Sequence, residues 1–294
     1  MIAQFGQPAQ SPPDEGSPVV PPRFVPLPAS GKVRQAVAFF ALNWPGLVMV
    51  VSMVSSTAIG NEVSSGLGDG PNEHLFTALL LLACALCFPC AIRLGEVLGK
   101  RRAIEILCMA GIAGHLIMAV APWYPVALTG HVIAGMLFGV GPLCLLAMGD
   151  CFPGRKALLV VTPVTIVLSG STTSLVNAWT PRVLNAVGWR GAEVAVALLI
   201  VSALLLMRTV PRYPAESAGV RLGEVGLAGK LFEGAGPGLI IVGVVDGVTL
   251  GWSSAFALPV AAVGAGILGV SVVRGRRAKR EVGQVRVLPP SVRR

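Results

Sequence analysis

The chain has 294 residues, of which 54 % are hydrophobic and only 13 % are charged. A soluble domain usually carries about 25 % charged residues, so this composition excludes an ordinary soluble globular protein. The net charge of +9 could indicate nucleic-acid binding, but the basic residues lie in short stretches between long apolar runs. The sequence contains no metalloprotease, hydrolase or nucleotide-binding motif. It therefore predicts a membrane protein that is not an enzyme, binds no nucleic acid and uses no cofactor.

Eight apolar runs are long enough, or nearly long enough, to cross a bilayer as helices, which takes about 20 residues. In chain order they are residues 36–59, 75–92, 106–121, 126–148, 157–178, 194–207, 236–251 and 255–273. A long connection separates the first six runs from the last two. The sequence predicts an all-α membrane protein of about eight transmembrane helices, arranged as a six-helix bundle and a two-helix hairpin.

The flanking segments complete the predicted domain organisation. Residues 1–35 are rich in proline and are expected to form a disordered cytoplasmic extension. The bundle is predicted at 36–208, a cytoplasmic linker at 209–235, the hairpin at 236–273 and a basic cytoplasmic tail at 274–294.

The basic residues also predict the topology. If the N-terminus is cytoplasmic and the eight runs alternate in direction, only Arg182 and Arg190 of the 23 lysines and arginines fall outside. Lysine and arginine are enriched in cytoplasmic loops. We therefore expect a multi-pass protein of the cell (plasma) membrane with both termini in the cytoplasm.

Three cysteines, Cys84, Cys87 and Cys90, share one arc of the second predicted helix. Thiolates at this spacing could bind a soft metal. Cysteine is also a small apolar residue that packs well in helix interfaces, and this is the favoured interpretation, so no metal site is predicted.

Small residues recur at four-residue spacing on two of the runs. Gly135 and Gly139 form one such pair, and Gly243, Gly247 and Gly251 form a longer series. Small residues at this spacing let helix backbones approach closely. Plain close packing is the favoured interpretation, and a sliding interface between moving helices is the alternative.

Two ionisable residues lie deep in apolar runs. Asp246 is predicted about midway along the seventh run, and His131 one turn into the fourth. An ionisable group at membrane depth is a functional candidate because it is costly unless paired or hydrated. Each is therefore a candidate for proton coupling or substrate binding, and a hydrogen bond to a neighbouring helix is the structural alternative.

Three further ionisable residues receive weaker predictions. Glu193 and Asp150 are predicted near the membrane interfaces, where Arg190 and Arg155 could neutralise them, and a structural role is favoured for both. His115, within the third run, receives no assigned role.

The connection between the second and third runs, residues 92–102, reads IRLGEVLGKRR. It resembles the loop-2/3 signature of the major facilitator superfamily, G-x-L-a-D-r-x-G-r-r-r. The matching residues are Leu94, Glu96, Gly99, Lys100, Arg101 and Arg102, while Ile92 replaces the first glycine and Glu96 the usual aspartate. In that family the cluster latches the cytoplasmic side, so the resemblance implies a conformational latch. A basic turn that only sets topology is the alternative.

The order of later features resembles the fourteen-helix drug:proton antiporters of that family. Residues 152–157 resemble the connection between helices four and five of that subfamily. The Gly-Trp-Arg at 188–190 resembles the opening of its helix six, and residues 251–254 resemble the turn between its two extra central helices. The resemblance covers about residues 36–290, which correspond to the N-terminal half of such a transporter plus its two central helices.

Three elements depart from the subfamily pattern. The first run lacks the usual aspartate, His131 stands where an arginine is usual, and residues 170–181 lack the antiporter motif.

The resemblance implies a secondary active transporter, most simply one that couples proton movement to efflux of lipophilic or cationic small molecules. Its implied partners are the lipid bilayer, protons, an unknown small-molecule substrate, and a second half-transporter chain or a second copy of this chain. The alternative is a truncated or diverged half-transporter that acts as a membrane interaction protein without transporting anything.

Overall fold

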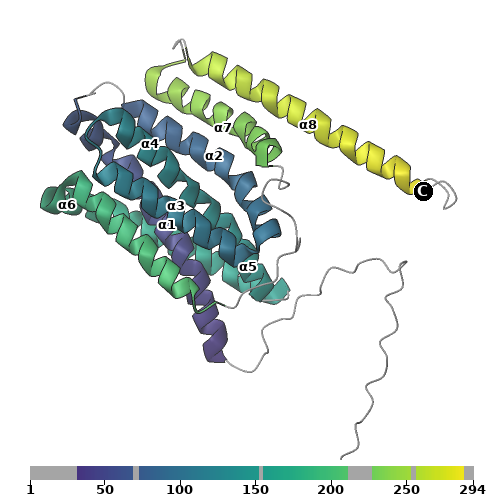
Figure 1. Cartoon of the computed structure of the whole chain (residues 1–294), viewed down its shortest axis with the longest axis horizontal. Helices are drawn as coiled ribbons and strands as arrows, with labels where there is room; N and C mark the ends of the chain where they lie inside the picture. Colours follow the sequence, from purple (N-terminus) through teal and green to yellow (C-terminus); the bar gives the residue numbers. More distant parts are fainter. Residues whose placement is uncertain (1–31, 69–72, 152–154, 211–226, 253–255, 288–294) are drawn as a thin grey trace, which may run out of the picture.

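Figure 1 shows a computed structural model of the chain, which describes residues 32–68, 73–151, 155–210, 227–252 and 256–287. Every regular element in these ranges is a helix. In chain order the elements are α1 (Lys32–Gly66), α2 (Glu73–Leu98), α3 (Lys100–Ala119), α4 (Tyr124–Gly135), the 3-10 helix η2 (Met136–Gly139), α5 (Val140–Cys151), α6 (Arg155–Met207), α7 (Leu227–Leu250) and α8 (Ala257–Val287). Seven helical segments are long and apolar enough to cross a membrane, with α4, η2 and α5 forming one of them. The predicted all-α membrane fold is confirmed.

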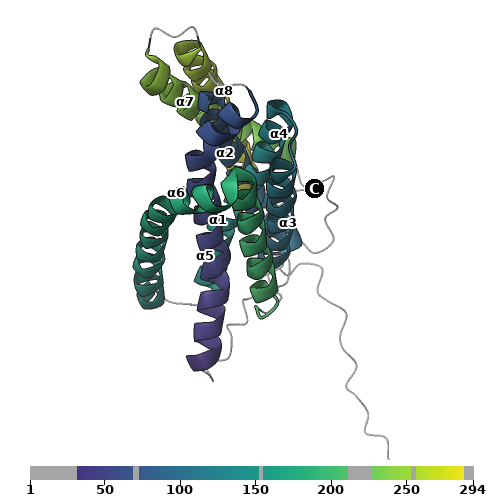
Figure 2. The same cartoon turned by 90° about the vertical axis from the view of Figure 1, so that its left-hand side faces the viewer.

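The longest helix, α6, accounts for two of the predicted crossings. Its 53 residues would extend far beyond a hydrocarbon layer of about 30 Å. Gly188 interrupts it with φ 67° and ψ 177°, a backbone conformation that glycine adopts without a steric penalty. Figure 2 shows the result, an arch with a first arm (155–187) and a second arm (189–207). If each arm crosses separately, the seven segments correspond to the eight predicted crossings. The connection expected between the arms is helical up to the break at Gly188.

The fourth crossing changes its helix type in the middle. Pro142 has no N–H, and its ring would collide with the carbonyl of residue 138 in a regular α-helix. The chain tightens into η2 just before this point, and the Val140 N–H bonds to the Leu137 carbonyl. The Met136 carbonyl instead accepts a hydrogen bond from the Cys87 thiol of α2, at 3.0 Å. Cys87 thus contributes to the packing of α2 on the fourth crossing.

Glycines lie where α2 meets the fourth crossing. A Cβ atom added to Gly135 would lie 2.6 Å from the Cβ of Ala83, and one added to Gly139 would lie 2.5 Å from the Cβ of Ala91. Only a residue without a side chain allows these two helices to be so close. Both glycines therefore lie at a close helix contact, and whether the two helices slide there stays a prediction.

The second glycine series lies in the hairpin of α7 and α8. A Cβ on Gly243 would lie 2.6 Å from the Ala257 carbonyl oxygen, and one on Gly247 would lie 2.7 Å from the Trp252 ring. Gly251 has φ 91° and lies in the turn after α7. The three glycines therefore keep the hairpin tight.

The hairpin attaches to the bundle through α7, which packs along α2 (Figure 1). Its helices are longer than predicted, because α7 begins at Leu227, inside the expected linker, and α8 continues to Val287, inside the expected tail. A helix needs no apolar residues to continue past the membrane surface, so hydropathy alone underestimates its length. The proline-rich segment 1–31 and residues 211–226 of the linker lie outside the described residues.

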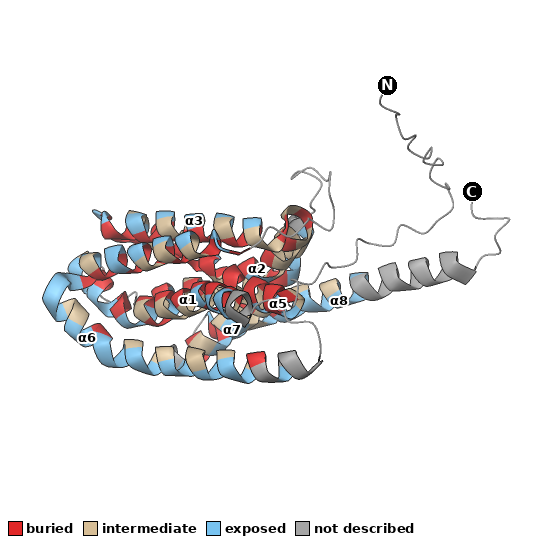
Figure 3. Ribbon diagram, turned by 90° about the horizontal axis from the view of Figure 1, so that it is seen from below, coloured by how far each residue is buried: buried red, intermediate tan, exposed pale blue. Residues whose placement is uncertain are grey.

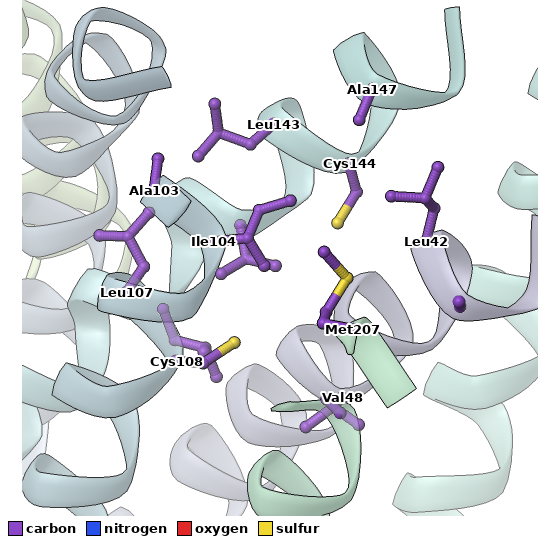
Figure 4. Packing of buried hydrophobic residues seen from close by; sticks show 14 of the residues in the cluster. Leu42, Val48, Ala103, Ile104, Leu107, Cys108, Leu143, Cys144, Ala147 and Met207 are labelled. Carbon is purple, nitrogen blue, oxygen red and sulfur yellow. The ribbon is translucent and has the colours of Figure 1, made fainter. Parts of the chain in front are cut away.

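The larger core cluster lies between α1, α3, α5 and the second arm of α6 (Figure 4). Leu42, Ile104, Leu143 and Ile200 are among its fully buried members. By contrast, Figure 3 shows that most of the first arm of α6 is exposed. The core is therefore centred on four crossings, and the first arm lies at its margin.

Candidate functional site

Three polar side chains form a hydrogen-bonded network in the interior of the bundle. Ser52 of α1, His115 of α3 and Glu193 of the second arm of α6 are 2 %, 0 % and 1 % exposed. Ser52 Oγ lies 2.8 Å from His115 Nε2, and His115 Nδ1 lies 2.5 Å from Glu193 Oε2. The imidazole therefore bridges a hydroxyl and a carboxylate from two other helices.

The positions of these residues follow from local helix geometry. A Cβ on Gly114 would lie 2.2 Å from the Ala134 backbone nitrogen, so α3 lies directly against α4 at this level. The next residue, His115, is rotated by about 100° and meets α1 and α6 instead. Glu193 follows five residues after the break at Gly188, within the first turns of the second arm.

The hydrogen bonds of these three side chains are compatible with more than one position of the protons. A serine hydroxyl both donates and accepts hydrogen bonds, so Ser52 can satisfy His115 Nε2 whether that nitrogen carries a proton or not. Glu193 Oε2 accepts from His115 Nδ1 in either case. Glu193 Oε1 is buried and has no hydrogen-bond partner. An ionised carboxylate with one bare oxygen is costly inside an apolar bundle, and an added proton on the imidazole would make the pair neutral overall.

The first predicted coupling residue, His131, is tied to α2. It is fully buried, its Nε2 lies 2.9 Å from the Phe76 carbonyl oxygen, and its ring stacks on that of Phe76 with the centroids 3.6 Å apart. A carbonyl oxygen only accepts, so Nε2 donates, and the buried Nδ1 has no partner. This is the cross-helix hydrogen bond of the structural alternative.

The second predicted residue, Asp246, is also buried, and its Oδ1 has no partner. It lies four residues before the end of α7 rather than at mid-span, because α7 begins well before the apolar run. Because α7 packs mainly on α2 and α8, Asp246 is not part of the network of Ser52, His115 and Glu193. The structure thus places neither His131 nor Asp246 in that network.

Basic residues of the predicted latch gather at one end of the bundle, called the basic end below. Lys100 forms an ion pair with Asp150 at the end of α5. Arg101 pairs with Glu105 at 2.9 Å and also donates to the Val210 carbonyl oxygen beyond α6. The start of α3 is thereby connected to α5 and to the segment that follows α6.

The other latch residues make different contacts. Glu96 pairs with Arg93 of its own helix at 2.9 Å, whereas Lys100 and Arg101 of the basic run pair with Asp150 and Glu105. Gly99 has φ 85° and permits the reversal into α3. Leu94 packs against the core and Arg102 is exposed. Asp150 pairs with Lys100, and its expected contact with Arg155 concerns a side chain outside the described residues.

Sequence reasoning missed the buried network of Ser52, His115 and Glu193. It placed Glu193 at an interface beside Arg190, whereas Arg190 donates to the Ala121 carbonyl oxygen at 3.0 Å and lies over the Trp189 ring, 4.2 Å from its centroid. The available signal was chemical complementarity, because a serine and a histidine occur in two different predicted spans and a glutamate directly precedes a third.

The cysteines form no metal site in the part of the chain that is described. No group of three His, Cys, Asp or Glu side chains there could hold a metal ion.

The fold and this network define a class: a polytopic α-helical membrane protein with a buried imidazole–carboxylate pair. No protein-family model matches the sequence, and a search of curated proteins finds no significant match. Membership of the major facilitator superfamily therefore stays a prediction from the motif resemblance.

Proposed function

We propose that this chain is a secondary active transporter of the cell membrane, in which His115 and Glu193 bind the coupling proton. The observation that carries the proposal is their 2.5 Å contact in a fully buried position. Ionisable residues inside a membrane bundle are expensive and commonly belong to proton or ion pathways.

The arrangement suggests how proton binding would affect the helices. A protonated imidazole beside the carboxylate forms a neutral ion pair that links α3 to the second arm of α6. Loss of that proton leaves a net negative charge in the apolar core, with Glu193 Oε1 still unpartnered. A cationic substrate or water can relieve this charge only if the helices separate. Proton release and cation entry would then be alternatives, which is the logic of an antiporter.

The predicted efflux of lipophilic or cationic small molecules agrees with this logic. The carboxylate supplies the attraction for a cation, and the surrounding core supplies apolar contacts. At the basic end, the contacts of Lys100 and Arg101 hold three segments together. These contacts would have to break for that end to open, as expected of a latch on the cytoplasmic side.

An enzymatic role is disfavoured by the burial of Ser52. The order serine, histidine, acid also occurs in hydrolases. However, a nucleophilic hydroxyl must reach its substrate, and Ser52 is enclosed by packed helices.

A half-transporter that acts as an interaction protein is the second candidate. It is favoured by the exposed first arm of α6, where Leu159, Ile166 and Val167 are 64–65 % exposed. A companion chain or a second copy could cover this face and complete a transport cavity.

The proposal can be tested in proteoliposomes that contain a pH-sensitive dye. A lipophilic cation such as ethidium, added to wild-type vesicles with a preset pH gradient, should release protons. Glu193→Gln keeps the side-chain volume but removes the titration, and it should abolish this response. Asp246→Asn, outside the network, is the matched control and should retain it.

The outcomes separate the alternatives. No response in the wild type, with properly folded protein, would contradict transport by the chain alone and favour the interaction protein. A normal response in Glu193→Gln would contradict the assigned proton site. Loss of the response only in Asp246→Asn would place proton coupling in the hairpin.

A further inference from the structure

A groove of about 560 Å³ lies between α2 and α7 at the basic end. It is independent of the buried network, which involves α1, α3 and α6. Phe88, Pro89 and Ile92 of α2 form its apolar part, and Phe88 is 52 % exposed. Figure 1 shows the two helices side by side. They are in close contact, since a Cβ on Gly234 would lie 2.4 Å from the Ala85 carbonyl oxygen.

The polar part of the groove carries two ion pairs, one from each helix. Arg93 Nη1 lies 2.9 Å from Glu96 Oε2 on α2, and Lys230 Nζ lies 2.7 Å from Glu233 Oε2 on α7. All four side chains line the groove and are 33–50 % exposed. The site therefore presents two cations and two carboxylates, with no net charge.

The apolar and polar parts are ordered along α2. Arg93 follows Phe88 by five residues, which is about 7.5 Å along a helix. The charges lie toward the end of α2, so with the basic end at the predicted membrane surface Phe88 is the deeper residue. A phospholipid has the same order, with acyl chains deep and a charged headgroup at the surface.

We infer that this groove binds a phospholipid whose zwitterionic headgroup ends in a primary ammonium, the headgroup of phosphatidylethanolamine. The phosphate contacts Arg93 and Lys230, the ammonium donates to Glu96 and Glu233, and an acyl chain lies along Phe88. Basic pockets between transmembrane helices bind lipid phosphates, and charge-assisted hydrogen bonds are the strong ones.

The charge balance sets the lipid preference. An anionic headgroup such as phosphatidylglycerol would satisfy the two cations but meet two carboxylates without a counter-charge. Phosphatidylcholine carries no N–H and cannot donate to the carboxylates. The bound lipid would join the six-helix bundle to the hairpin at a place where the two already pack together.

The experiment measures lipid binding to the full-length protein by native mass spectrometry. The purified protein is titrated with phosphatidylethanolamine, phosphatidylcholine or phosphatidylglycerol of identical acyl chains. Wild-type protein should bind phosphatidylethanolamine most tightly. The double variant R93Q/K230Q should lose at least about fivefold in affinity for each basic residue removed.

A second double variant tests the charge balance directly. E96Q/E233Q leaves two cations without their carboxylates, so its preference should change from phosphatidylethanolamine to phosphatidylglycerol. The matched controls are Arg102→Gln, an exposed arginine at the same end, and Glu62→Gln, an exposed glutamate at the other end. Both should keep the wild-type preference. Size-exclusion profiles and helical content confirm that each variant is folded.

Two results would overturn the inference. One is equal affinity of the wild type for the three lipids, which would indicate only non-specific surrounding lipid. The other is an unchanged headgroup preference in folded E96Q/E233Q.

Discussion

Replacement of His115 by leucine should be among the most destabilising single changes in the bundle. Glu193 Oε1 already lacks a partner, and the replacement removes the 2.5 Å contact of Oε2 as well. Removing one member of a buried pair costs about 3–5 kcal/mol. Glu193→Leu is less severe, because the remaining imidazole can stay neutral and keep Ser52 as its partner. Its expected cost is about 1–3 kcal/mol.

The double variant H115L/E193L leaves neither group unpaired, so it should cost less than the sum of the two single changes. We expect a coupling free energy of about 1–3 kcal/mol, measured by equilibrium unfolding in detergent micelles at neutral pH. Asn43→Ala provides the control, because Asn43 bonds to Phe39 and Thr165 instead. Combined with Glu193→Leu it should be additive within about 0.5 kcal/mol. Additive effects of the His115 and Glu193 changes would refute the pairing on which the proposed proton site rests.

Three further predictions concern packing, the basic end and topology. Gly114→Ala should destabilise the protein by about 1–3 kcal/mol, because its Cβ would lie 2.2 Å from the α4 backbone. Gly149→Ala is the control, because its Cβ enters open space. Equal shifts of the unfolding temperature in the two variants would contradict this reasoning. Lys100→Gln removes the ion pair to Asp150, the residue before Cys151. The buried Cys151 thiol should then react faster with a water-soluble maleimide. An unchanged rate would show that the ion pair does not restrict access to the basic end. A cysteine at Glu62 should be labelled from outside intact cells, and labelling only after permeabilisation would reverse the topology.

The fold could be predicted from the sequence because membrane spans depend on one strong property. Runs of about 20 apolar residues are needed to cross the hydrocarbon layer, and such runs are visible without any knowledge of contacts. Helix ends were less predictable, since α7 and α8 extend through charged segments. The helical geometry of 179–187, up to the break at Gly188, is a further difference from the predicted connection.

The candidate site could not be predicted in the same way. Whether a polar side chain in a span is functional depends on what lies opposite it, and the partners of His115 are 63 and 78 residues away in sequence. Depth alone favoured His131 and Asp246. His131 instead bonds to a backbone carbonyl of α2, and Asp246 lies near the end of α7. Residue depth therefore identified buried polar groups but not the network.

The location of the network bears differently on the two requirements of the proposed transporter, proton binding and alternating access. Ser52, His115 and Glu193 all belong to the six-helix bundle, so the proposed proton binding needs no second chain. Alternating access is different, because carriers of the proposed family move one half against another around a midplane site. The exposed first arm of α6 borders the bundle on a side where a second half could pack. A chain of this kind could thus bind and release protons alone yet transport only with a partner. Proton exchange without cation flux in the purified protein, with flux restored by a companion chain, would distinguish this case from a complete carrier.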